Sequence, residues 1–199
     1  LLFNGCAQKI TLDFTPSEVL PSKSKIDAEI KTITVSSAKE KDAYGTIQVG
    51  VMGNSYEQSF KTTLKDSIEE SLARSAIFND LSSNKVSLMV KVMQFETPSM
   101  GITFDTDCII RYQFIDRKNG KVVFSRDVKT IGTVSFDYAF MGLVRYTEAR
   151  NDAVRDNIKL FLESLKGSTF KVLTDDDLGI LIQKSVKSIE QNNLDKNKS

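Results

Sequence analysis

Few residues of this chain could perform chemistry. Cys108 is a nucleophile by type, but it lies within an alternating apolar stretch of strand character, and the 199-residue sequence has no histidine to activate it. We therefore expect Cys108 to be a buried and inert thiol. The absence of histidine also removes the commonest general base and the commonest metal ligand at neutral pH.

Carboxylate groups offer little more. Asp105 and Asp107 lie two residues apart, hence on one face of a strand, where paired carboxylates can bind a cation or act as acid and base. No third ligand is spaced nearby, so an exposed strand face explains them more simply. Three aspartates at 175–177 lack the spacing and glycine of a calcium loop, and they suit a helix start. The sequence therefore predicts no enzyme activity, no metal and no cofactor.

The second cysteine, Cys6, stands in a different setting. The chain opens as Leu1-Leu2-Phe3-Asn4-Gly5-Cys6 and then turns polar. This start resembles the end of a bacterial lipoprotein signal peptide, whose cysteine is lipidated and becomes the mature N-terminus. The resemblance implies lipidation of Cys6, and Ala7 after it implies the periplasmic face of the outer membrane. An ordinary terminus with a free thiol is the alternative.

Composition limits the class of protein. The apolar content of 40% and the charged content of 27% are those of a globular domain. A net charge of +1 argues against nucleic acid as a partner, because binding it requires a concentrated basic face. No run of about 18 apolar residues is present, so the sequence predicts no membrane-spanning helix.

Alternating apolar and polar residues predict the strands. The longest such pattern, residues 102–128, predicts an antiparallel hairpin with a tight turn at Asn119-Gly120. Residues 85–96 are apolar on both faces, which favours a central strand. Further strands are predicted at 30–36 and 46–51. Together these patterns predict an antiparallel sheet of about five strands that contains a three-stranded meander.

Helical spacing of apolar residues completes an α+β fold. Two main amphipathic helices are predicted at residues 55–78 and 145–165, with Ser55 as a helix cap and Gly167 as a C-terminal stop. A short C-terminal helix is predicted at 174–190. The predicted organisation is a lipobox-like signal remnant (1–6), a tether with a short strand-like piece (7–29), an α+β domain (30–166), a helical extension (167–190) and a disordered tail (191–199).

The stretch from residue 131 to 142 is the least expected part of the sequence. Phe136, Tyr138 and Phe140 alternate, which favours a strand that continues over the core. The alternative is a loop that presents these rings and Met141 to a partner or to lipid. Charged residues of the helix that follows, including Arg145 and Arg150, indicate most simply a solvated face, and an arginine cluster that serves a partner is the alternative.

The order of these elements resembles one family. A lipobox-like cysteine, a tether, two strands, a helix, a meander and a second helix are similar in order to small envelope lipoproteins of the YajG-like kind. The clearest local match is the run Ala153-Val154-Arg155-x-Asn157-Ile158-x-x-Phe161-Leu162. This resemblance implies an α+β domain that faces the periplasm, and it carries no catalytic residues to this chain.

The leading hypothesis is an outer-membrane lipoprotein that acts as a non-enzymatic binding or assembly module, such as a subunit of an envelope secretion or motor complex. Its predicted partners are the outer membrane, through lipid on Cys6, and an envelope protein that contacts Phe136, Tyr138, Phe140 and Met141. The alternative is a periplasmic carrier that binds an apolar ligand between the sheet and the helices. An envelope enzyme that uses Asp105 and Asp107 is the least favoured reading.

Overall fold

The structure is a computed structural model that describes residues 11–48, 54–98, 101–168, 170, 173 and 175–196. Cys6, the predicted lipidation site, lies outside the described residues. The described elements are four strands, three α-helices and two short 3-10 helices. In chain order they are β1 (Glu29–Ser37), η1 (Glu40–Asp42), α1 (Asn54–Ser75), β2 (Lys85–Glu96), β3 (Phe104–Asp116), β4 (Val122–Val134), η2 (Phe136–Tyr138), α2 (Gly142–Leu165) and α3 (Asp175–Lys196).

The strands form one mixed sheet in the order β1-β2-β3-β4. The predicted meander is confirmed, since β2, β3 and β4 pair antiparallel, and β2 is internal as its two apolar faces predict. The prediction of about five antiparallel strands is wrong. β1 pairs parallel to β2 because helix α1 carries the chain back between them. Within the predicted strand 46–51, Ile47 makes only an isolated bridge to Phe95, and residues 49–51 lie outside the described part.

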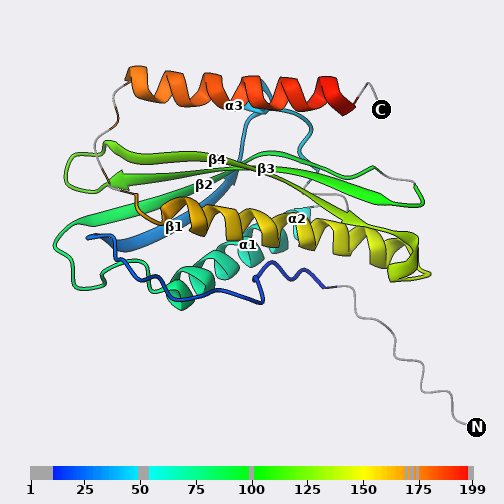
Figure 1. The fold of residues 1–199 in the computed structure, drawn as a ribbon, viewed down its shortest axis with the longest axis horizontal. Coiled ribbons are helices and arrows are strands. Elements are labelled where there is room, and N and C mark those ends of the chain that lie inside the picture. Colours follow the sequence, from blue (N-terminus) through cyan, green and yellow to red (C-terminus); the bar gives the residue numbers. More distant parts are fainter. Residues whose placement is uncertain are drawn as a thin grey trace, which may run out of the picture.

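The elements stack in three layers (Figure 1). Helices α1 and α2 cover one face of the sheet, and α3 lies across the opposite face. The main core fills the space between the sheet and the first two helices. On helix α1, the four residues that the spacing predicts to be buried are buried in this core: Phe60, Leu64, Ile68 and Leu72.

A β-bulge in β2 turns the side chain of Phe95 toward the face of the sheet that the helices cover. The pairing with β3 shifts between Val92 and Gln94, which returns Phe95 to the helix-covered face. Met93 points away from it and packs with Ile109 in a small separate cluster. Strict alternation along the sequence places Met93 and Phe95 on the same face, and the bulge makes this expectation wrong for Phe95.

Several helix boundaries differ from the predicted ones. Helix α1 begins at Asn54, so Ser55 lies inside the helix and is not its cap. Helix α2 begins at Gly142, three residues early, and Gly167 follows it with a φ of 75°, as predicted for a C-terminal stop. Helix α3 continues to Lys196, past the predicted end at residue 190 and into the segment that the sequence predicts to be a disordered tail.

Residues 11–28, predicted as part of a tether, pack along the outside of α1 and α2 (Figure 1). The Phe14 ring is fully buried and meets Phe60 edge to face. Asn151 of α2 donates to the carbonyl of Thr11 at 3.0 Å and accepts from the amide of Asp13 at 3.2 Å. This described part of the segment is therefore held against the domain.

No helix in the described part of the chain is long and apolar enough to span a membrane.

Candidate interaction surface

The structure confirms that Cys108 is a buried thiol. The residue is fully buried on β3, and burial raises the pKa of its thiol to about 12. A thiol of this kind stays protonated at neutral pH and does not act as a nucleophile.

The two carboxylates of the predicted pair, Asp105 and Asp107, lie on β3. Asp105 accepts a hydrogen bond from the Thr133 hydroxyl on the neighbouring strand at 2.8 Å, and it lies at the surface. Among the described residues, no group of three acidic, cysteine or histidine side chains is placed to hold a metal ion.

The most distinctive surface lies where β4 passes into α2. The strand ends at Val134, so the predicted strand extension through Phe140 is wrong and the alternative, a loop with exposed rings, is observed. The chain forms the short helix η2 and then enters α2 at Gly142. We name this surface the aromatic tip, and its exposed apolar residues are Phe136, Tyr138, Phe140, Met141 and Leu143.

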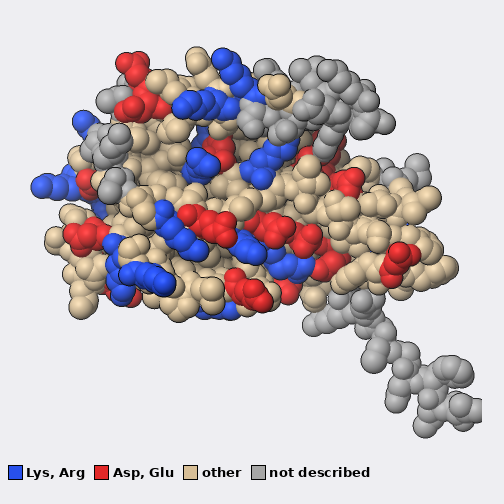
Figure 2. All heavy atoms as spheres, in the orientation of Figure 1, with Lys and Arg blue, Asp and Glu red and all other residues tan. Residues whose placement is uncertain are grey.

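Exposure of the aromatic tip is large for apolar side chains. Phe140 is 89% exposed, Met141 59% and Tyr138 50%. Ile102 is 76% exposed and lies two residues before Phe104, which pairs with Val134 at the end of β4. It therefore lies at the same end of the sheet. Figure 2 shows that this end carries mostly uncharged residues, whereas charged side chains gather along α2. Apolar patches of this kind mark contact sites in soluble domains.

Arg145 holds the aromatic tip in place from beneath. Its side chain is buried, and one guanidinium nitrogen donates to the carbonyls of Ala139 at 2.6 Å and Phe140 at 3.2 Å. The guanidinium carbon also lies 4.8 Å from the centre of the Phe136 ring. Charge-assisted bonds to two loop carbonyls and a cation–π contact fix the backbone that presents the rings.

A second buried arginine of α2, Arg150, links this helix to other segments of the core. Arg150 is fully buried and donates to the carbonyl of Gln48 at 2.7 Å and to the Tyr146 hydroxyl at 3.0 Å. Its guanidinium lies 4.4 Å from the centre of the Phe95 ring. The sequence-based assignment of Arg145 and Arg150 to a solvated face is therefore wrong. Arg150 lies four residues from both Tyr146 and Val154, and this spacing already placed it on the apolar stripe.

The local sequence match on α2 has a structural explanation. Asn157 is fully buried, donates to the Val128 carbonyl at 2.9 Å and accepts from the Tyr112 hydroxyl at 2.9 Å. Around it, Ala153, Val154, Ile158, Phe161 and Leu162 are buried against the sheet. The match therefore describes how α2 docks on the sheet.

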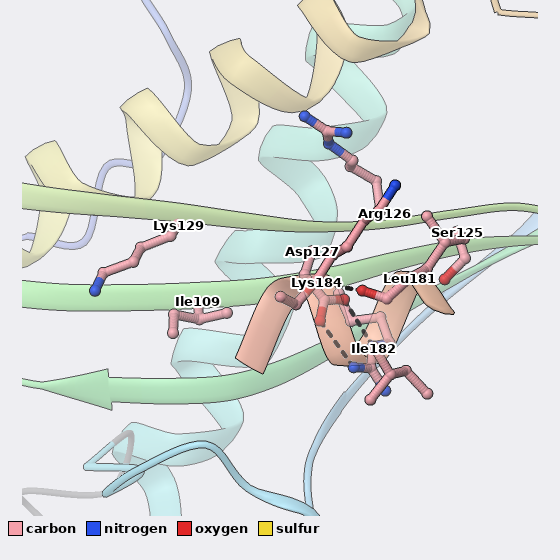
Figure 3. A pocket seen from close by; sticks show the side chains of 10 residues that line it. Ile109, Ser125, Arg126, Asp127, Lys129, Leu181, Ile182 and Lys184 are labelled. Carbon is pink, nitrogen blue, oxygen red and sulfur yellow. Dashed lines mark hydrogen bonds and ion pairs between the residues drawn. The ribbon is translucent and has the colours of Figure 1, made fainter. Parts of the chain in front are cut away.

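A polar cluster lies on the opposite face of the sheet. Arg111 of β3 makes two bonds to the Asp127 carboxylate of β4, at 2.7 and 2.8 Å, and also contacts Tyr44. Burial and Asp127 raise the pKa of the Tyr44 hydroxyl to about 12. A pocket of about 220 Å³ separates this cluster from α3, with Leu181 and Lys184 on the helix side (Figure 3).

The comparisons with known proteins find relatives in structure alone. No protein-family model matches the chain, and no curated protein matches it in sequence. The Xanthomonas campestris protein XCC0632, of the family DUF330, superposes with a TM-score of 0.52 at 18% identity, over 78% of this chain and 92% of that chain. This likeness shows a shared fold.

Two further solved structures superpose more loosely. A candidate lipoprotein from Caulobacter crescentus gives a TM-score of 0.41 at 13% identity, over 68% of this chain and 88% of its own. A minor lipoprotein from Acinetobacter baumannii gives 0.38 at 12% identity, over 72% and 96%. The resemblance to YajG-like lipoproteins stays a prediction.

Proposed function

We propose that this protein is a lipid-anchored, non-enzymatic binding protein of the bacterial envelope, with the aromatic tip as its contact surface. The observation that carries the proposal is the tip itself. Five apolar side chains are exposed together, and a buried arginine, Arg145, fixes the backbone beneath them. A rigid surface of this kind loses little conformational entropy on binding.

The lipid anchor of this proposal rests on the start of the chain. Gly5 and Cys6 fit the lipoprotein motif, and Ala7 favours the outer membrane. The finer expectation, a subunit of an envelope secretion or motor complex, has no residue of this chain to support it and stays a prediction.

The packing between the sheet and the helices bears on the carrier hypothesis. Most of this space is filled by one cluster of buried side chains, and a pocket of about 300 Å³ lies between β1 and α1 with Ile33, Leu72 and Glu69 in its lining. Within the cluster the rings of Tyr112 and Phe161 stack at 3.9 Å, and α2 touches the backbone of β4 at Gly132. A carrier requires a largely apolar cavity for its ligand, whereas the lining of this pocket includes the charged residues Lys31, Glu69 and Asp80.

The anchor is tested by the mass of the N-terminal peptide of protein recovered from the membrane fraction of its bacterial host. We expect a diacylglyceryl or triacyl mass on Cys6, lost together with membrane association in the Cys6→Ser variant. An unmodified peptide that begins upstream of Cys6 would overturn the anchored function.

A further inference from the structure

The partner of the aromatic tip can be inferred from its chemistry and from its distance to Cys6. Its exposed residues, which include Phe136, Tyr138 and Phe140, combine large apolar rings with one hydroxyl. Amphipathic and aromatic side chains of this kind gather at the interface between water and lipid. The arginine nearest to them, Arg145, is buried under the tip, so the contact relies on apolar burial and not on positive charge.

The length of the segment between Cys6 and the described residues limits which end of α2 the lipid on Cys6 can approach. The first described residue, Thr11, is bonded to Asn151 on α2. Thr11 lies five residues after Cys6, and a fully extended chain of five residue steps spans about 17 Å. Nine residues separate Asn151 from the start of α2 at Gly142, which is about 14 Å along the helix. Lipid on Cys6 is therefore within reach of the tip.

The far end of α2 is out of reach of the same lipid. Leu165 lies fourteen residues beyond Asn151, or about 21 Å along the helix. Phe161, one turn before it, stacks on Tyr112 near the end of β3, and so this far end lies toward the hairpin turn. Of the two ends of α2, the tip end is therefore the one that a lipid on Cys6 can approach more closely.

We propose that the aromatic tip inserts into the lipid interface of the membrane that carries Cys6, as a second membrane contact beside the acyl chains. This inference rests on the proposed function, because it takes Cys6 as the anchored residue. Tip and anchor together restrict the orientation of the domain more than one attachment point does, because only rotation about the line that joins them remains. The hairpin turn and residues near Leu81 then point away from the membrane.

The absence of tryptophan makes a direct test simple. In the full-length chain, Phe140→Trp places a fluorophore at the tip, and Leu81→Trp places the control. Leu81 is 93% exposed and lies between α1 and β2, at the end of the sheet where Val86 pairs with Asp116. Met141→Trp is a second tip reporter, which keeps the test usable where Phe140→Trp folds poorly.

Both reporters are attached to vesicles through Cys6 in vitro. The thiol of Cys6 is coupled to maleimide-bearing phosphatidylethanolamine in vesicles of phosphatidylethanolamine and phosphatidylglycerol that contain brominated lipid. Cys108 is fully buried and does not compete for the maleimide. This coupling places lipid at residue 6 whether or not the cell does so, and the test is therefore independent of the mass of the native N-terminal peptide.

We expect the tip reporter to shift to shorter emission wavelength and to be quenched several-fold more than the Leu81→Trp control, with no dependence on salt. Equal quenching of the two reporters, or no quenching at the tip, would overturn the proposal and favour a protein partner for this surface. Tip quenching in coupled vesicles combined with an unmodified Cys6 in cells would overturn the anchored function alone.

Discussion

The two ends of the β3–β4 hairpin finish in opposite ways. At the turn, Asp116 accepts from the amide of Lys118 at 2.7 Å and from the side chain of Asn119 at 2.9 Å, and Gly120 takes a φ of 72°. These polar groups are paired within the turn. At the other end, rings and aliphatic groups of the aromatic tip stand exposed. The turn needs no further partner in water. The exposed apolar side chains of the tip, in contrast, are stabilised when another surface covers them and removes them from water.

The two ends of the hairpin also differ in the groups that hold their backbone in place. The turn is held by its own backbone and short polar side chains, with the Gly120 amide bonded to the Asp116 carbonyl at 2.8 Å. The tip is held by Arg145, whose buried guanidinium bonds two loop carbonyls. Burial of an arginine costs free energy because its charge is removed from water. Arg145 is buried at the position where its bonds fix an exposed apolar loop.

The largest expected effect comes from Gly132, where β4 meets α2. A Cβ added there would lie 2.1 Å from the Ala149 carbonyl oxygen and 2.4 Å from the Ala153 nitrogen. Because both atoms are backbone, Gly132→Ala should lower the free energy of unfolding by about 3 kcal/mol, measured by urea denaturation. The control is Gly179→Ala in α3, where a Cβ meets nothing within 4 Å, and it should stabilise by up to about 1 kcal/mol.

Removal of Arg145 should loosen one end of the molecule and not the other. We expect Arg145→Leu to lower the free energy of unfolding by about 2 kcal/mol, since two carbonyls lose a charged donor. Hydrogen exchange should accelerate at residues 136–141 and stay unchanged at 117–121. Arg126→Leu, at an exposed arginine, serves as the control and should change neither. Equal acceleration at both ends would contradict the local role of Arg145.

A glycine at each end gives a smaller contrast. Gly120→Ala should lower the free energy of unfolding by about 1 kcal/mol, because its φ of 72° favours glycine. Gly142→Ala at the tip should change it by less than about 0.5 kcal/mol, because a Cβ there meets only a flexible arginine atom at 3.9 Å. Thermal denaturation of the two variants side by side measures the difference, and a reversed order would show that the turn is not the strained position.

The smallest effect on stability is expected at the most exposed ring. Phe140→Ser should change the free energy of unfolding by less than about 0.5 kcal/mol, because 89% of the residue is already in contact with water. The same substitution at Phe104, which is 5% exposed at the same end of the sheet, provides the destabilised reference in urea denaturation. A large loss from Phe140→Ser would mean that the tip is part of the core.

Local patterns predicted most of the elements. The four-residue spacing of Phe60 to Leu72 and the doubly apolar pattern of β2 identified α1 and the inner strand because burial alone sets those patterns. The direction of β1 depends on the crossover through α1, and the position of Phe95 depends on a bulge. Neither leaves a signal in hydrophobic alternation.

The tip was only partly predictable. The alternation of Phe136, Tyr138 and Phe140 suits a strand and an exposed loop equally well, and the outcome depends on where α2 begins. The burial of Arg145 and Arg150 runs against the general rule that charged side chains are exposed. Their partners are loop carbonyls, including that of Gln48, about a hundred residues away from Arg150.

The most direct test of the account compares the two ends of the hairpin on one membrane. Phe140→Cys and Lys118→Cys are introduced separately into the lipidated protein on vesicles, where Cys6 carries the lipid and Cys108 is buried. The measured quantity is the rate of reaction with a membrane-impermeant thiol reagent, with and without detergent. We predict that vesicles protect the cysteine at the tip and leave the one at the turn fully reactive. Equal rates at the two positions would contradict the account.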